Sequence, residues 1–186
     1  MDAKTDNYFL DTEFHDPTSA GFSVDFISVG LVAENKEFYG VYDQINEEKY
    51  RGEWIEENVI RKLPPQNQRL SVEKIREGLL QTFHPAKAIT IWAHNGSYDF
   101  YILARIFGGQ LAFRKALLKA HGIETITFRD TKEITRLLPQ GYKFPVQEKA
   151  TEHIAIHDAR HERDVFYAAS RYRPKAPHPG QTLGPV

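Results

Sequence analysis

The chain has 186 residues, of which 41% are hydrophobic and 26% charged, the composition of an ordinary globular protein that can bury a sizeable core. It has no cysteine, so disulfides and thiolate metal sites are excluded, and a metal ion would need oxygen or imidazole ligands. The formal net charge of −1 excludes a basic surface that coats long nucleic acid, but not a site that holds a few nucleotides at one strand end.

The two ends of the chain differ from the middle in composition. Residues 1–7 are polar and lack an apolar signal region, and no apolar run is long enough to span a bilayer, so we expect a cytoplasmic protein without membrane association. Residues 174–186 contain four prolines and two glycines and are expected to form a disordered tail. The remaining residues, 1–173, show no internal repeat and are expected to form a single domain.

Three β-type runs come first in the chain, at residues 8–14, 26–33 and 37–42, and Glu34-Asn35-Lys36 fits a hairpin connection between the last two. Helical and strand-type runs alternate after them. Helical spacing is found at 50–62, 72–80, 98–107, 111–121 and 155–172, and strand-type runs at 89–93 and 125–128. This order predicts an α/β fold with a mixed five-stranded sheet and helices on its faces.

The first run carries two acids, Asp11 and Glu13, after an apolar lead. Alternate side chains of a strand point to the same face, so the two carboxylates are expected about 6 to 7 Å apart on one face of an inner strand. They would repel each other unless a cation lay between them, and hard oxygen ligands suit Mg²⁺ or Mn²⁺. Two solvated acids at an exposed strand end are the alternative.

The segment HNGSYD joins the strand at 89–93 to the next helix, and Ser97 is its expected N-cap. Asp99 then lies in the first helical turn, at the carboxyl end of a buried strand, where open α/β sheets place ligands. An acid also stabilises a helix N-terminus by roughly 0.3 to 1 kcal/mol, so capping alone is the alternative for Asp99. Ordinary turn roles are the alternative for His94 and Asn95.

The segment EHIAIHDARHERD contains the pattern His-x-Ala-x-x-Asp at His153 and Asp158, and a near copy at His157 and Glu162. A spacing of five residues puts two groups about 140° apart on a helix, so the histidine must lie on the entering loop and the acid inside the helix. The apolar helix face begins at Ala155, which favours the first register. The second register stays open, as does an amphipathic helix whose polar face is solvated.

The chain resembles the DEDDh group of 3′-to-5′ exonucleases, which have a ribonuclease H-like fold. The resemblance lies in the order of three motifs: Asp-x-Glu on an early strand, HNGSYD at a strand-to-helix turn, and His-x-Ala-x-x-Asp at the last helix. The resemblance covers nearly the whole chain, residues 8–172. Within that group, the chain resembles the small mycobacterial and phage-type exoribonucleases in stretches such as FLDTEF, IWAHNGSYDFYIL and HDAR. The chain departs from the group's pattern in its second copy of the third motif.

The resemblance implies a site with two divalent metal ions, Mg²⁺ or Mn²⁺. Asp11 would bridge both ions. Glu13 and Asp158 would complete the ion on the nucleophile side, and Asp99 would serve the ion on the leaving-group side. His153 would act as the general base.

The resemblance also implies substrate contacts, and the candidates are Thr12 through its backbone, Phe14 against the terminal nucleotide, and Asn95 in the HNGSYD turn. A plain core role is the alternative for Phe14. The implied partners are 3′ ends of single-stranded RNA or DNA, with RNA favoured, and a second copy of the chain in a homodimer. The open alternatives are an exodeoxyribonuclease of the same fold, another metal-dependent hydrolase of that fold, and a catalytically silent nucleic-acid-binding module.

Overall fold

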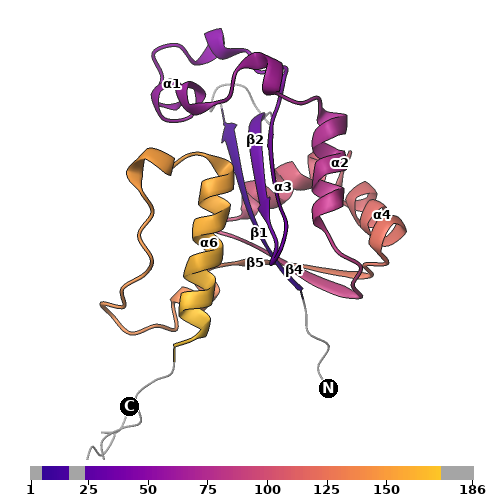
Figure 1. The fold of residues 1–186 in the computed structure, drawn as a ribbon, viewed down its shortest axis with the longest axis vertical. Coiled ribbons are helices and arrows are strands. Elements are labelled where there is room, and N and C mark those ends of the chain that lie inside the picture. Colours follow the sequence, from indigo (N-terminus) through magenta and orange to yellow (C-terminus); the bar gives the residue numbers. More distant parts are fainter. Residues whose placement is uncertain (1–5, 17–23, 173–186) are drawn as a thin grey trace, which may run out of the picture.

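A computed structural model describes residues 6–16 and 24–172 of the chain (Figure 1). Strand β1 (Asp6–His15) is the central strand of a five-stranded sheet with the order β3-β2-β1-β4-β5. Strands β2 (Asp25–Val32) and β3 (Glu37–Val41) are antiparallel to their neighbours, whereas β4 (Ala88–Ala93) and β5 (Thr125–Asp130) run parallel. The predicted α/β fold with a mixed sheet is confirmed, and it is consistent with a ribonuclease H-like fold. The tail predicted at 174–186 lies outside the described residues.

Helices cover both faces of the sheet (Figure 1). They are α1 (Trp54–Asn58), α2 (Val72–Thr82), α3 (Ser97–Ile106), α4 (Gln110–His121), α5 (Lys132–Thr135) and α6 (Ala155–Ser170), with 3₁₀ turns η1 (Glu47–Tyr50), η2 (Ile60–Lys62), η3 (Gln66–Gln68) and η4 (Lys149–Thr151). In the part of the chain that the structure describes, none of these helices has the length and apolarity to cross a membrane.

The side chains of β1 alternate between the two faces of the sheet, and each face packs against its own layer of the core. Tyr8 and Leu10 are fully buried in the larger cluster, with side chains of α2, α3 and α4. Phe9 points to the other face, where its ring packs on Phe166 of α6, with 5.1 Å between ring centroids. Because side chains two residues apart share a face, Asp11 has the parity of Phe9 and faces α6.

Gly30 of β2 brings α6 close to this strand. It pairs with Asp11 across the β1–β2 ladder, and a Cβ atom at Gly30 would overlap the backbone carbonyl of Ala155, the first residue of α6. The missing side chain therefore lets the start of α6 contact the sheet directly beside Asp11.

Two local predictions are wrong. Residues 50–62 form α1 and parts of two 3₁₀ turns instead of one helix, because Gly52 takes a left-handed conformation with φ of 79°. Ser97 is the first residue of α3, and Gly96 is the N-cap. Asn95, with φ of 53°, already reverses the chain, so the helix begins one residue earlier than predicted.

Candidate active site

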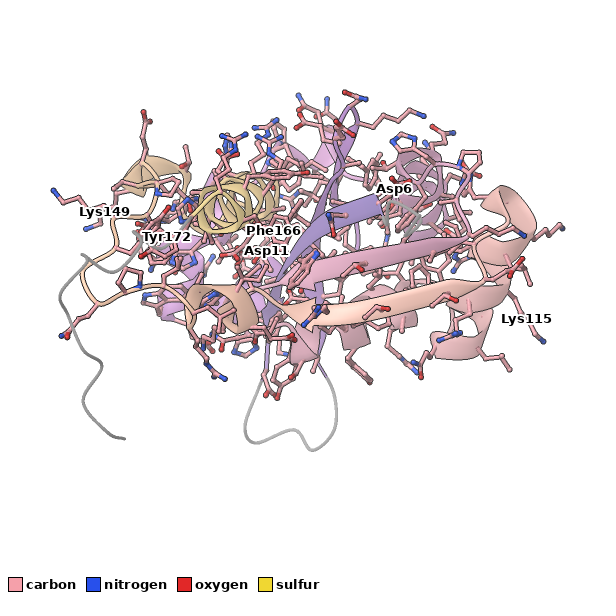
Figure 2. All side chains as sticks on the ribbon, turned by 90° about the horizontal axis from the view of Figure 1, so that it is seen from below. Asp6, Asp11, Lys115, Lys149, Phe166 and Tyr172 are labelled. Carbon is pink, nitrogen blue, oxygen red and sulfur yellow. The ribbon has the colours of Figure 1, made fainter. Side chains whose placement is uncertain are left out.

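All eight residues predicted as site residues line one pocket of about 520 Å³, formed by the end of β1, the turn after β4, and the start of α6 with the loop before it. They are Asp11, Thr12, Glu13, Phe14, Asn95, Asp99, His153 and Asp158. In Figure 2 the labelled Asp11 lies beside α6 and away from Lys115 at the other end of the molecule. The fold thus brings three distant segments together, while the role of each residue stays a prediction.

Asp11 and Glu13 lie among other acids with little solvent around them. Burial raises the pKa of Asp11 well above its ordinary value, and the charges of Glu13, Asp99 and Asp158 raise it further. Burial, followed by the charges of Asp158 and Asp99, raises the pKa of Glu13 to about 8. Protons are therefore retained on this strand unless another positive charge replaces them.

Asp99, in the first turn of α3, is 6% exposed and is held by β1. The backbone N–H and the hydroxyl of Thr12 both donate to Asp99 Oδ1, at 2.8 and 2.7 Å. Burial raises the pKa of Asp99, and these two hydrogen bonds oppose the rise. Capping of α3, the alternative role for Asp99, would not require these contacts with β1. The substrate contact predicted for the Thr12 backbone stays a prediction.

His153 and Asp158 have the loop-and-helix arrangement expected from their spacing. His153 lies two residues before α6 and has φ of 58°, a left-handed conformation that is uncommon outside glycine. Its backbone N–H donates to Asp158 Oδ2 at 2.9 Å, and Gln147 Nε2 donates to Oδ1. One potential ligand atom each of Glu13, His153 and Asp158 lies within 4.8 Å of the other two.

The second register places its two residues differently. His157 is not among the described residues that line the pocket, and its Nδ1 lies 3.4 Å from Arg160 Nη1. Glu162 does line the pocket, where its Oε2 accepts a hydrogen bond from Thr131 Oγ1 at 2.6 Å. Of the near copy, then, only the acid reaches the candidate site.

Several residues in or beside the pocket were not predicted as site residues. Glu162 was considered only as the acid of the second register, although a residue four positions after Asp158 lies on the same helix face. Trp54 on α1 lies beside the pocket and could not be predicted, since its ring meets that of His153 edge-on, with centroids 4.8 Å apart, across 99 positions that carry no shared pattern. Gln147 lies in the irregular segment before α6 and gave no local indication either.

Phe14 and Asn95 border the opening of the pocket. The Phe14 ring stacks on Tyr98 with centroids 4.9 Å apart and planes 26° from parallel, and it also packs against the main core. Phe14 therefore combines a core contact with a place at the pocket. Asn95 is exposed, and its side-chain oxygen accepts a hydrogen bond from Lys132 Nζ.

Carboxylate oxygens dominate the donor set of the pocket, which the imidazoles of His94, His153 and His161 also line. Such a set could hold hard divalent cations such as Mg²⁺ or Mn²⁺, which prefer oxygen ligands. The residues able to do so are Asp11, Glu13, Asp99, Asp158 and His153.

No family model matches the chain. Two proteins of Mycobacterium tuberculosis, one from strain CDC 1551 and one from strain H37Rv, are each named a 3′-5′ exoribonuclease. Each is 34% identical to this chain over 110 residues, which make up 56% of this chain and 63% of the relative. The similarity thus spans less than two thirds of the length of either curated relative.

Proposed function

We propose that the chain is a metal-dependent 3′-to-5′ exonuclease that acts on single-stranded RNA and releases nucleoside 5′-monophosphates. The observation that carries this proposal is the convergence of four carboxylates and His153 in one pocket. The names of the two mycobacterial relatives support both the direction of hydrolysis and the choice of RNA.

The electrostatics of the pocket support a role for metal ions. Burial raises the pKa values of Asp11, Glu13 and Asp99, and the charges of neighbouring acids raise them further, the charge of Glu162 in the case of Asp99. Cations that displace the retained protons would relieve the repulsion between these charges. We infer that Asp11, Glu13, Asp99 and Asp158 would together hold two divalent ions here.

Two divalent ions supply an activated water and stabilise the charge of the leaving 3′ oxygen. His153 would accept the proton that the water loses, because an imidazole can take up a proton near neutral pH. Asp158 holds the His153 backbone through the N–H, and so fixes where the ring enters the pocket.

The stacked pair of Phe14 and Tyr98 supports binding of the terminal nucleotide. An aromatic face at the pocket edge can stack on a base without reading its identity. Asn95 presents a polar side chain at the same opening, beside the position that the ribose and phosphate would take. Both contacts would position the last phosphodiester over the carboxylates.

The test is a time course on 5′-labelled RNA and DNA of one sequence, with Mg²⁺, Mn²⁺ or EDTA. RNA should shorten stepwise from its 3′ end with either ion and not in EDTA, and a circular RNA should stay intact. Asp11→Ala should lower the rate at least about 100-fold, the cost of losing one electrostatic catalytic group. The exposed acid Glu77 on α2 gives the matched control, Glu77→Ala, which should be fully active. Cleavage without metal ions, or full activity of Asp11→Ala, would overturn the proposal.

A further inference from the structure

A second cavity, of about 740 Å³, adjoins the candidate active site along α3. Tyr98 lines the first pocket and Tyr101 the second, and residues three apart on a helix are neighbours on its surface. The pockets also meet on the sheet, where Phe14 of the first pairs in register with Phe26 of the second. A ligand that extends out of the acidic pocket along α3 therefore enters this cavity.

We propose that this cavity holds the nucleotides upstream of the 3′ end, with a base stacked on Tyr101 and a phosphate bound by Arg105. The inference rests on the proposed function, because the 3′ end has to lie in the acidic pocket. It goes further in assigning a binding site for single-stranded nucleic acid outside the catalytic residues.

The aromatic residues of α3 carry the first part of the argument. Tyr98 and Tyr101 are 42% and 46% exposed, although tyrosine rings are largely apolar. Both lie on the outward side of the helix, whose inward residues Ile102, Leu103 and Ile106 are buried in the core. Two exposed rings one turn apart form a stepwise surface on which successive bases can stack.

Charge carries the second part. The acidic pocket is lined by six carboxylates, those of Asp11, Glu13, Asp99, Glu152, Asp158 and Glu162. The charged residues of the second cavity are Asp25, Lys49 and Arg105, of which the first two form an ion pair. Arg105 is exposed and has no ion pair within residues 6–16 and 24–172. An unpaired guanidinium beside exposed rings suits the phosphates of a single strand, once the terminal phosphodiester is held at the carboxylates.

The experiment compares substrate lengths. For the wild-type protein, kcat/KM should be higher on an RNA of eight nucleotides than on a dinucleotide, because only the longer strand fills the second cavity. Tyr101→Ala and Arg105→Ala should each reduce the ratio of the two kcat/KM values about tenfold, as expected for one stacking or phosphate contact. Tyr101→Phe keeps the ring and should keep the ratio. Arg114→Ala, which removes an exposed arginine of α4 outside both pockets, is the matched control.

Binding of the same RNA of eight nucleotides, measured by fluorescence anisotropy with Ca²⁺ in place of Mg²⁺, gives a second readout. Weaker binding by Tyr101→Ala and Arg105→Ala, and not by Arg114→Ala, would support the upstream site. If this result were found and no RNA were cleaved, only the proposed function would fail. If the wild-type protein degrades RNA and both variants match Arg114→Ala in length dependence and in binding, the upstream site is refuted and the proposed function stands.

Discussion

His153 is held in its left-handed conformation by contacts from two other parts of the chain. Such a conformation costs of order 1–3 kcal/mol for a residue other than glycine, so the surrounding structure has to maintain it. Asp158 does so through the backbone N–H, and the edge-on ring of Trp54 restricts the imidazole. The side chain proposed as the base is thus positioned before any substrate arrives.

This arrangement predicts the effect of removing Trp54. Trp54→Ala should lower kcat about 10- to 100-fold with little change in KM, because a small displacement of a catalytic group is enough to slow the reaction by this amount. Trp54→Phe keeps an aromatic edge and should retain most of the activity. Because Trp54 is 61% exposed, the thermal unfolding temperature should hardly change. Wild-type kcat in Trp54→Ala would show that Asp158 alone positions the histidine.

The two histidines of the repeated motif give a matched pair of variants. His153→Ala should lower kcat by about 10² to 10⁴, the range for losing a general base. His157→Ala should be close to wild type, because His157 does not line the pocket in the described part of the chain. Steady-state kinetics on one RNA substrate would check both, and the reverse ranking would assign the base to His157.

The acids of the site predict a dependence of stability on pH in the metal-free protein. Glu13 has its pKa raised from 4.5 to about 8, so its protonated form is favoured by folding. Its contribution to stability is complete below pH 4.5 and is lost as the pH rises through 8. Thermal unfolding in EDTA should therefore occur at lower temperature at pH 8.5 than at pH 5.

The variant Glu13→Gln should reduce this dependence on pH, since a neutral amide has no proton to lose. Excess Mg²⁺ should restore the stability of the wild-type protein at pH 8.5, by about 2.7 kcal/mol at one hundred times the dissociation constant. Glu77→Gln is the control for removal of an exposed acid. An equally steep pH dependence in Glu13→Gln would show that Glu13 is not the responsible group.

Among the elements, β1 and α6 contribute most to the candidate site, and Gly30 determines how close α6 can come to β1. Gly30→Val should push the start of α6 away from β1, lower stability by about 1–3 kcal/mol through overpacking, and reduce activity more than the loss of folded protein explains. Gly108→Ala is a suitable control. Gly108 has φ of 88° and open space around it, so the variant strains the backbone far from the pocket and should leave kcat unchanged. Denaturant unfolding and kinetics on both variants would separate the two effects.

The strands could be predicted more reliably than the segment between β3 and α2. Short apolar runs define β1 and β2 locally, and they predicted the sheet class and the shared face of Asp11 and Glu13. Residues 50–62 also have helical spacing, but their apolar side chains are divided among short turns that pack on Ile27 of β2. Such long-range packing overrides local propensity and cannot be read from the segment alone.

The residues of the candidate site also differ in whether a local sequence pattern or long-range packing determines their place. Those in compact motifs, such as Asp99 and Asp158, could be predicted because the motif fixes both the residue type and the element that carries it. Trp54, which contacts His153, and Gln147, which lines the pocket, reach the candidate site only through long-range folding. Nothing in their own neighbourhoods indicates that they do.

At the scale of the whole molecule, charge is separated between two adjoining cavities. Although the net charge is only −1, an acidic pocket lies next to a cavity with an arginine that has no ion pair among the residues that the structure describes. A uniformly basic protein would attract nucleic acid anywhere along its length, whereas this distribution favours only a strand that ends in the acidic pocket. The homodimer stays a prediction, which sedimentation at several protein concentrations would test.

The order of the elements along the chain also has a consequence for biosynthesis. Asp11 and Glu13 leave the ribosome early, but His153 and Asp158 belong to α6 and the loop before it, which follow all other described elements. A growing chain therefore lacks the proposed base and one of the four proposed carboxylate ligands until the segment that contains α6 has been synthesised.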